Sequence, residues 1–196
     1  MWKQIIVGSF FFSLVALAEA GLPPQELIES VANETIDRVK AEKQAIKKNP
    51  KHIHKLVNEL VLPHFDFERM SKWALGKHWR KANKDQRTKF INEFRVLLVR
   101  TYATSLAEYT DQVIKFLPFR GKLKSGDVTV RSEVEQPGGF PIPIDYKLHL
   151  KGDSWKVYDV KIDDISLVAN YRSSFSKEIR KKGLDTLIKT LAEKNA

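Results

Sequence analysis

The hydrophobic period of this chain changes twice, and this limits the folds that it can adopt. Up to about residue 110 the apolar residues recur at helical spacing, from 113 to 162 they alternate with polar ones, and then the helical spacing returns. The strongest helical pattern covers residues 85–109, where one apolar stripe runs over several turns. Helices, strands and helices in this order predict one α+β domain.

Start and stop residues divide the N-terminal helical region. Pro23-Pro24 opens a long amphipathic stretch. Asn49-Pro50 is typical of an N-cap followed by proline at the first helical position, and that helix is expected to end before Pro63. A further helix is predicted over residues 64–76, with Asp66 near its start.

The C-terminal region repeats this pattern after the strands. Helical spacing resumes at Ile165, and Asp164 directly before it is predicted to be the N-cap. Gly183 interrupts the pattern, and a last helix is expected over residues 184–191.

The alternating region predicts four strands joined by short connections, so we expect an antiparallel meander. The predicted fold is a twisted antiparallel sheet of about four strands with several helices packed on one face. The predicted strands cover residues 113–119, 128–134, 142–150 and 155–162.

The last strand does not alternate cleanly. Trp155 and Val157 point one way, while Tyr158, Val160 and Ile162 point the other way. Either a bulge shifts the register or both faces of this strand are covered.

The first twenty residues predict export from the cytoplasm. Lys3 is followed by a short apolar run from Ile5 to Leu17 and then by small residues, which is the pattern of a secretory signal peptide. Cleavage is expected after Ala20, with Ala18 as a second position, so that residues 21–196 form a single mature domain. The apolar run is too short for a permanent membrane-spanning helix.

The charge of the chain favours anionic partners. The chain has 34 Lys and Arg against 24 Asp and Glu, a net charge of +10, which removal of residues 1–20 does not change. Outside the cytoplasm, such a charge favours membrane surfaces and acidic proteins rather than nucleic acid, and scattered lysines also keep a protein soluble. The chain has no cysteine, which excludes disulfides, thiol catalysis and an N-terminal lipid anchor on cysteine.

No motif of metal binding or nucleophilic catalysis occurs in the sequence. Asp159 is the carboxylate that could have a catalytic role. It shares a side of its strand with Trp155 and Val157, and a carboxylate inside a cone of sheet and helices can act as a general base. The alternative is structural, with Asp159 meeting a lysine or arginine.

Several long motifs resemble one known family, the MlaC family, also called the toluene-tolerance or phospholipid-binding auxiliary family. The resemblance covers nearly the whole mature chain. The segments that carry it are Leu62–Phe67, Trp73–Arg80, Phe90–Phe94, Thr101-Tyr102, Trp155–Val160, Ile165–Phe175 and Gly183–Ile188.

The resemblance implies a periplasmic phospholipid carrier that is not an enzyme and has no cofactor, with phospholipid as its cargo. It implies a monomer that shuttles lipid between an outer-membrane lipoprotein–porin complex and an inner-membrane ABC transporter with its mammalian-cell-entry-type subunit. Such transport maintains the lipid asymmetry of the outer membrane. Two alternatives stay open: a cone-shaped acid–base enzyme that uses Asp159, and a lipid-free periplasmic binding module.

A carrier of this kind needs an apolar cavity, because two acyl chains bring on the order of thirty methylenes at ~0.8 kcal/mol each. The resemblance therefore implies that the sheet and the helices enclose an apolar lipid cavity. The same apolar residues would also fill a solid core. Arg172 and Arg80 are candidates for holding the lipid phosphate, with surface ion pairs as the alternative. The predicted cavity residues are Leu98, Tyr102, Leu106, Val130, Ile144, Tyr146, Leu148, Val168, Tyr171 and Phe175.

Overall fold

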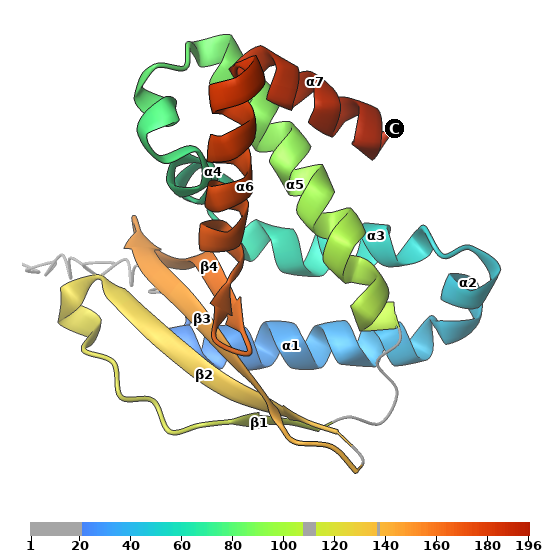
Figure 1. Ribbon diagram of the computed structural model, residues 1–196. Helices are drawn as coiled ribbons and strands as arrows, with labels where there is room; N and C mark the ends of the chain where they lie inside the picture. Colours follow the sequence, from blue (N-terminus) through green and yellow to red (C-terminus); the bar gives the residue numbers. More distant parts are fainter. Residues whose placement is uncertain (1–20, 108–112, 137) are drawn as a thin grey trace, which may run out of the picture.

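A computed structural model describes residues 21–107, 113–136 and 138–196 (Figure 1). The expected leader, Tyr109 and Pro137 lie outside these residues. The helical elements are α1 (Pro24–Ala41), α2 (Lys43–Lys48), α3 (His52–Leu56), η1 (Val57–Val61), η2 (Leu62–His64), α4 (Phe67–Leu75), η3 (Gly76–Arg80), α5 (Lys84–Ala107), η4 (Leu123–Ser125), α6 (Leu167–Lys182) and α7 (Leu184–Asn195). The strands are β1 (Val113–Phe116), β2 (Asp127–Glu135), β3 (Ile142–Lys151), β4 (Ser154–Ile162) and β5 (Ile165–Ser166).

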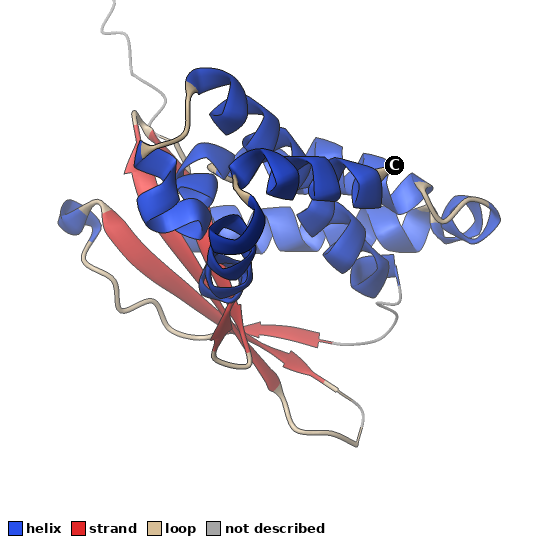
Figure 2. Cartoon of the chain, turned by 45° about the horizontal axis from the view of Figure 1, so that its top comes forward, coloured by secondary structure: helices blue, strands red, loops and turns tan. Residues whose placement is uncertain are grey.

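The strands form one sheet in the order β1-β2-β3-β4-β5, and every neighbouring pair is antiparallel. The predicted α+β class and the meander are therefore confirmed. Figure 2 shows the sheet as a layer along one side of the molecule, with the long helices gathered on the other side. The sheet has a fifth strand that the sequence did not predict.

This fifth strand corrects the expected start of the C-terminal helix. Asp163 and Asp164 have φ angles of 49° and 61°, and they turn the chain so that Ile162 pairs with Ile165. Two left-handed residues in a two-residue turn match the twist of the strands they connect, and aspartate tolerates this conformation better than most residues. Asp164 is thus not the N-cap, because a capping residue needs extended backbone; Ser166 takes that role and accepts the N–H of Ala169 at 3.1 Å.

Strand β4 combines both explanations for its broken alternation. The register with β3 shifts between Lys147 and Leu148, so Tyr158 is an extra residue in β4. Val157 packs on one side with Ile28 of α1, while Tyr158 packs on the other side with residues of α4 and α6. A bulge is present and helices cover both faces of this strand.

Apart from the start of α6 and the helix expected between Asn49 and Pro63, the helix ends follow the residues that the sequence singled out. Asp66 caps α4 by accepting the N–H of Arg69 at 3.0 Å, and Gly76 ends this helix with a φ of 52°. Gly183, with a φ of 84°, separates α6 from α7. The helix expected from Asn49-Pro50 to Pro63 begins at His52, with Lys51 rather than Asn49 as the N-cap, and is α-helical only to Leu56 before it continues as a π-helix and a 3₁₀ turn. Asn49 instead accepts the backbone N–H of Lys51 at 3.1 Å.

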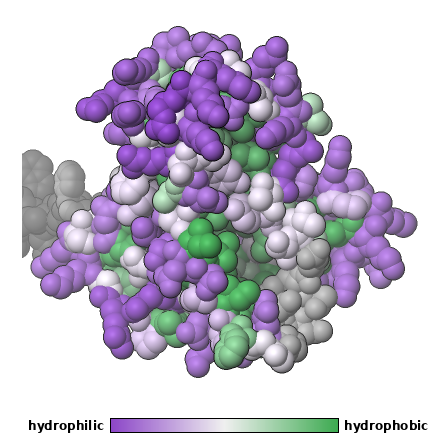
Figure 3. Space-filling view, in the orientation of Figure 1, coloured by the Kyte–Doolittle hydropathy of each residue, from purple (hydrophilic) through white to green (hydrophobic). Residues whose placement is uncertain are grey.

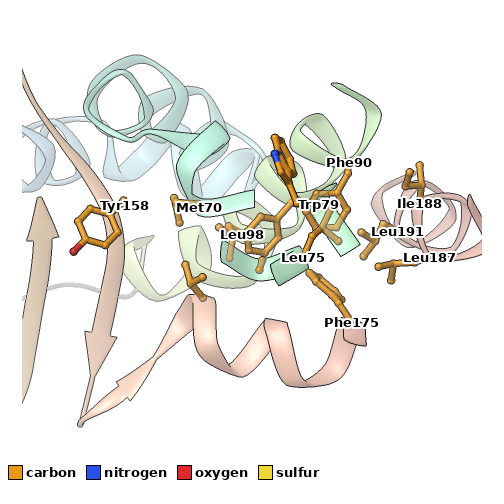
Figure 4. Packing of buried hydrophobic residues seen from close by; sticks show 13 residues of the cluster. Met70, Leu75, Trp79, Phe90, Leu98, Tyr158, Phe175, Leu187, Ile188 and Leu191 are labelled. Atoms are coloured by element: carbon orange, nitrogen blue, oxygen red, sulfur yellow. The ribbon is translucent and has the colours of Figure 1, made fainter. Parts of the chain in front are cut away.

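The buried core is divided into three clusters. The helical cluster joins α4, α5, α6 and α7, and Figure 4 shows its side chains meeting between these helices. The sheet cluster joins α1 to β2, β3 and β4 through Ile28, Val128, Val130, Leu148, Trp155, Val157 and Val160. The third, the α1–α5 cluster, contains Val39, Ile46, Ile53, Leu56, Val57, Val99 and Ala103. Within the described residues, no helix has the length and apolarity that a membrane span requires.

Candidate functional site

Half-buried apolar side chains border all three clusters. A domain of this size commonly has one contiguous core with smaller satellite clusters, whereas here the buried residues divide into three clusters of 13, 7 and 7 residues. Figure 3 shows hydrophobic residues in a recess in the middle of one face of the molecule. The half-buried apolar residues that pack against the clusters from η1, η2, α5, the sheet and α6 include Val61, Leu62, Leu97, Tyr102, Leu106, Ile144, Tyr146, Ile162, Leu167 and Tyr171. We call this set the apolar border.

The sheet side of the apolar border comes from residues that alternate along β3. Ile144 and Tyr146 face the same side as Leu148, and Tyr146 lies opposite Val130 of β2. Burial raises the pKa of the Tyr146 phenol, although part of its side chain remains accessible. Tyr146 thus lies half-buried at the border of the sheet cluster.

One polar atom interrupts this apolar surface. Ser132 lies opposite Ile144 in the ladder and is 1% exposed, and its hydroxyl lies near the Tyr146 phenol but forms no hydrogen bond of normal geometry with any described residue. A buried hydroxyl without a partner is unfavourable by about 1–3 kcal/mol. This group is therefore available to a ligand that brings a hydrogen-bonding atom.

The helix side of the apolar border comes from α5 and α6. Burial and the neighbouring Tyr171 phenol raise the pKa of Tyr102 to about 12, so the Tyr102 phenol is neutral at physiological pH. Tyr171 also contacts Phe94 edge to face, with 5.3 Å between the ring centroids. Tyr171 thus connects the aromatic core to the half-buried surface.

The structure divides the ten predicted cavity residues into two groups of five. Leu98, Val130, Leu148, Val168 and Phe175 are buried and belong to the core clusters. Phe175, for example, packs against both Phe90 and Phe94 with ring centroids 5.5 and 5.6 Å away. Tyr102, Leu106, Ile144, Tyr146 and Tyr171 belong to the apolar border.

Sequence reasoning missed the other half of this border. Val61, Leu62, Leu97, Ile162 and Leu167 were not among the predicted cavity residues. Ser132 was also missed, although a serine in the inward positions of an alternating valine strand is a visible signal.

The two candidate head-group arginines lie near the end of α4. Arg172 of α6 lies over Gly76, and its Nε is 2.8 Å from where a β-carbon of that residue would be. A guanidinium at a helix C-terminus is favourable because it faces the negative end of the helix dipole. Arg80 is exposed at the end of η3. The ion pairs formed within the described residues include neither arginine.

Asp159 is fully engaged by protein groups. Its Oδ1 accepts the backbone N–H of Val168 at 3.2 Å, and its Oδ2 accepts the hydroxyl of Ser166 at 2.7 Å. Lys147 lies 3.4 Å from the same Oδ2. These contacts fit the structural interpretation of Asp159, because they connect β4 to the start of α6.

A second buried carboxylate connects α4 to the sheet. Asp66 accepts hydrogen bonds from Lys151 and pairs with the His149 ring, each at 3.0 Å. The parts of the chain that the structure describes contain no group of three or more side chains arranged to hold a metal ion.

A twisted antiparallel meander covered by helices, with half-buried apolar side chains beside its core clusters, defines this chain as an α+β protein. The chain belongs to the MlaC family: residues 29–193 match the family described as "MlaC protein". The expected family is therefore confirmed over almost all of the mature chain.

Individual relatives agree with this assignment. The chain is 26% identical to the intermembrane phospholipid transport system binding protein MlaC of Haemophilus influenzae, over 93% of this chain and 86% of that protein. It is 29% identical to the toluene tolerance protein ttg2D of Pseudomonas putida, over 86% and 79% of the two chains. Among solved structures, a phospholipid-binding protein from Ralstonia solanacearum in complex with a phospholipid is 30% identical, with a TM-score of 0.82 over 89% of this chain and 97% of that chain.

Proposed function

We propose that this protein is a phospholipid carrier that shields acyl tails in the recess lined by the apolar border. The observation that carries the proposal is the division of the core into three clusters with half-buried apolar side chains between them. Apolar side chains facing an unfilled space are unfavourable alone and are stabilised when a lipid tail replaces water there. The phospholipid in the Ralstonia structure supports this choice of ligand.

The polar atoms of the recess suit the glycerol ester region of a phospholipid. The Ser132 hydroxyl can donate to an ester carbonyl, which would satisfy a group that forms no hydrogen bond of normal geometry with any described residue. The neutral phenols of Tyr102 and Tyr146 can donate in the same way. Hydrogen bonds at these positions would fix how deeply the tails enter.

Arg172 and Arg80 retain their predicted role as candidate cations for the phosphate, as part of this proposal. Arg172 is the better positioned of the two, since its contact with Gly76 restricts the guanidinium. A restricted guanidinium loses less entropy when it binds a phosphate through two hydrogen bonds.

The route of transport is part of the proposal as well. The leader-like residues 1–20 and the names of the relatives support a mature protein that works in the periplasm. There it would take lipid from or deliver it to an outer-membrane lipoprotein–porin complex and an inner-membrane ABC transporter with a mammalian-cell-entry-type subunit. A carrier of this kind performs no chemistry on its cargo, and the engagement of both Asp159 oxygens supports the non-enzymatic assignment.

A transfer assay tests the proposal. Mature protein at a concentration far below that of the lipid should accelerate movement of a labelled phospholipid from donor to acceptor vesicles. Ile144→Trp, which fills the recess, should slow transfer, whereas Lys177→Gln on the exposed surface of α6 should not. A lipid-free binding module would leave the transfer rate at its spontaneous value.

A further inference from the structure

One end of the sheet carries exposed leucines next to a run of cations. Leu123 and Leu150 are 49% and 45% exposed, and Leu22 is 49% exposed. Gly126 holds the first two together, because it donates to the Leu123 carbonyl at 3.1 Å and accepts from the Leu150 N–H at 2.9 Å. Leu22 follows Gly21, which lies against Asp153 and Ser154 of the adjoining β3–β4 turn.

The connection between β1 and β2 supplies the charge at this end. Residues 117–126 contain Arg120, Lys122 and Lys124 and no acidic residue. All three cations are exposed, and none of them takes part in the ion pairs of the described residues. Figure 1 shows this connection with its short η4 turn, and the β3–β4 turn beyond it, at the left end of the sheet.

The carboxylates near this end neutralise little of that charge. Asp127 is already paired with Arg69 at 2.8 Å. Asp153 in the β3–β4 turn is exposed. Lys151, next to Leu150, forms an ion pair with the buried Asp66 at 3.0 Å, so its charge is already neutralised.

A polar pocket of about 550 Å³ adjoins the same connection. Arg120 lines it together with Arg131 and Lys147, and the carboxylates of Asp127 and Asp145 also border it. Most of its lining side chains, such as Thr129 and Lys147, alternate along β2 and β3 with the inward-facing Val130 and Tyr146, although Val128 of the sheet cluster also borders it. It leaves space for a phosphate-bearing head group beside Arg120.

We infer that this end of the sheet contacts the surface of an anionic phospholipid bilayer. The contact surface consists of three leucines and three cations, Leu22, Leu123, Leu150, Arg120, Lys122 and Lys124. Lysine and arginine near an anionic bilayer each add about fivefold to binding, and apolar side chains flanked by cations enter the boundary between head groups and acyl chains. Leu123 between Lys122 and Lys124 has this arrangement. The contact would orient the protein on a membrane without using the recess.

Co-sedimentation with vesicles tests the inference on the full mature protein. We expect binding to vesicles of 30% phosphatidylglycerol in phosphatidylcholine, weaker binding at high salt, and little binding to pure phosphatidylcholine. The triple variant R120Q/K122Q/K124Q should reduce the partition coefficient about 100-fold. Leu123→Ser should reduce the binding that remains at high salt.

The control is the charge-matched variant K177Q/K181Q/K182Q. These exposed lysines lie in the C-terminal half of α6, outside the proposed contact surface, and their replacement changes the net charge by the same amount. The inference is wrong if the wild-type protein does not bind the anionic vesicles, or if both triple variants lose the same amount of binding. Phospholipid carried by each variant, measured by native mass spectrometry, should stay unchanged. A failure of the vesicle result would therefore leave the carrier proposal intact.

Discussion

The carboxylate of Asp159, in the middle of β4, accepts the backbone N–H of Val168 in the first turn of α6, at 3.2 Å between nitrogen and oxygen. Because Asp159 is 3% exposed, this bond forms away from water. The contact fixes the position of α6 relative to the sheet, and α6 contributes Tyr171 to the apolar border.

Asp159→Asn should therefore act on stability. The amide keeps the size of the side chain but removes the charge that Lys147 faces, and it presents a donor where Val168 or Ser166 needs an acceptor. We expect a loss of about 2–3 kcal/mol in the free energy of unfolding, measured by denaturant titration. Asp163→Asn in the exposed turn is the control and should change stability little. An Asp159→Asn variant with unchanged stability would contradict the structural role.

Asp66 predicts a pH dependence of stability. Burial alone would raise the pKa of its carboxyl, but the Arg69 N–H and the Lys151 ammonium outweigh burial and hold the pKa below the ordinary value of 3.8. A lowered folded-state pKa stabilises the protein above the unfolded-state pKa, and this stabilisation disappears as the pH falls through the folded-state value. Asp66→Asn should be less stable by about 2 kcal/mol at pH 6, and the difference from wild type should shrink below about pH 4. Thermal melts of both proteins across this pH range measure the difference. A difference in stability that stays constant with pH would contradict a role for the ionised Asp66 carboxylate.

The border and the core should respond differently to substitution. Leu148 is fully buried, so Leu148→Ala should lower the free energy of unfolding by about 2–5 kcal/mol and leave lipid affinity per folded molecule nearly unchanged. Ile144 is half-buried, so Ile144→Trp should extend into the recess, reducing lipid uptake with a small effect on the melting temperature. Uptake of a fluorescent phospholipid and melting curves measure the two effects. Equal loss of uptake and stability in Ile144→Trp would indicate a solid core.

Two buried hydroxyls that form no hydrogen bond of normal geometry within the described residues offer a matched pair. Ser71 of α4 lies in the helical region, whereas Ser132 faces the recess. Ser71→Ala should stabilise the lipid-free and lipid-loaded protein equally, by about 1 kcal/mol. Ser132→Ala should stabilise only the lipid-free protein, because the hydroxyl finds a partner in the lipid. Melting temperatures with and without lipid measure this, and identical behaviour of the two variants would exclude a contact between Ser132 and the cargo.

The fold could be predicted well where the signal is local. The period of hydrophobicity, the cap at Asp66 and the stops at Gly76 and Gly183 each depend on residues within one or two turns. The strand at Ile165 could not be predicted, because a two-residue strand has no period and depends on the left-handed backbone of the preceding aspartates. The broken alternation in β4 is consistent with a bulge, but the sequence does not give the position of the bulge, because that depends on the register with β3.

The site could be predicted only in part. Apolar side chains are chemically alike whether they fill a core or face a recess, so Val130 and Ile144 look equivalent in the sequence. Their different burial depends on how far α5 and α6 are held from the sheet, which no local pattern encodes. A Trp at Val130 or at Leu98 would therefore overpack a filled core, at a cost of about 1–3 kcal/mol, rather than only block lipid.

Native mass spectrometry of the mature chain tests the central claim most directly. The account predicts a mass that exceeds that of residues 21–196 by one phospholipid, and delipidated protein that takes up one labelled phospholipid per chain. Delipidated, folded protein that binds no phospholipid would contradict the account.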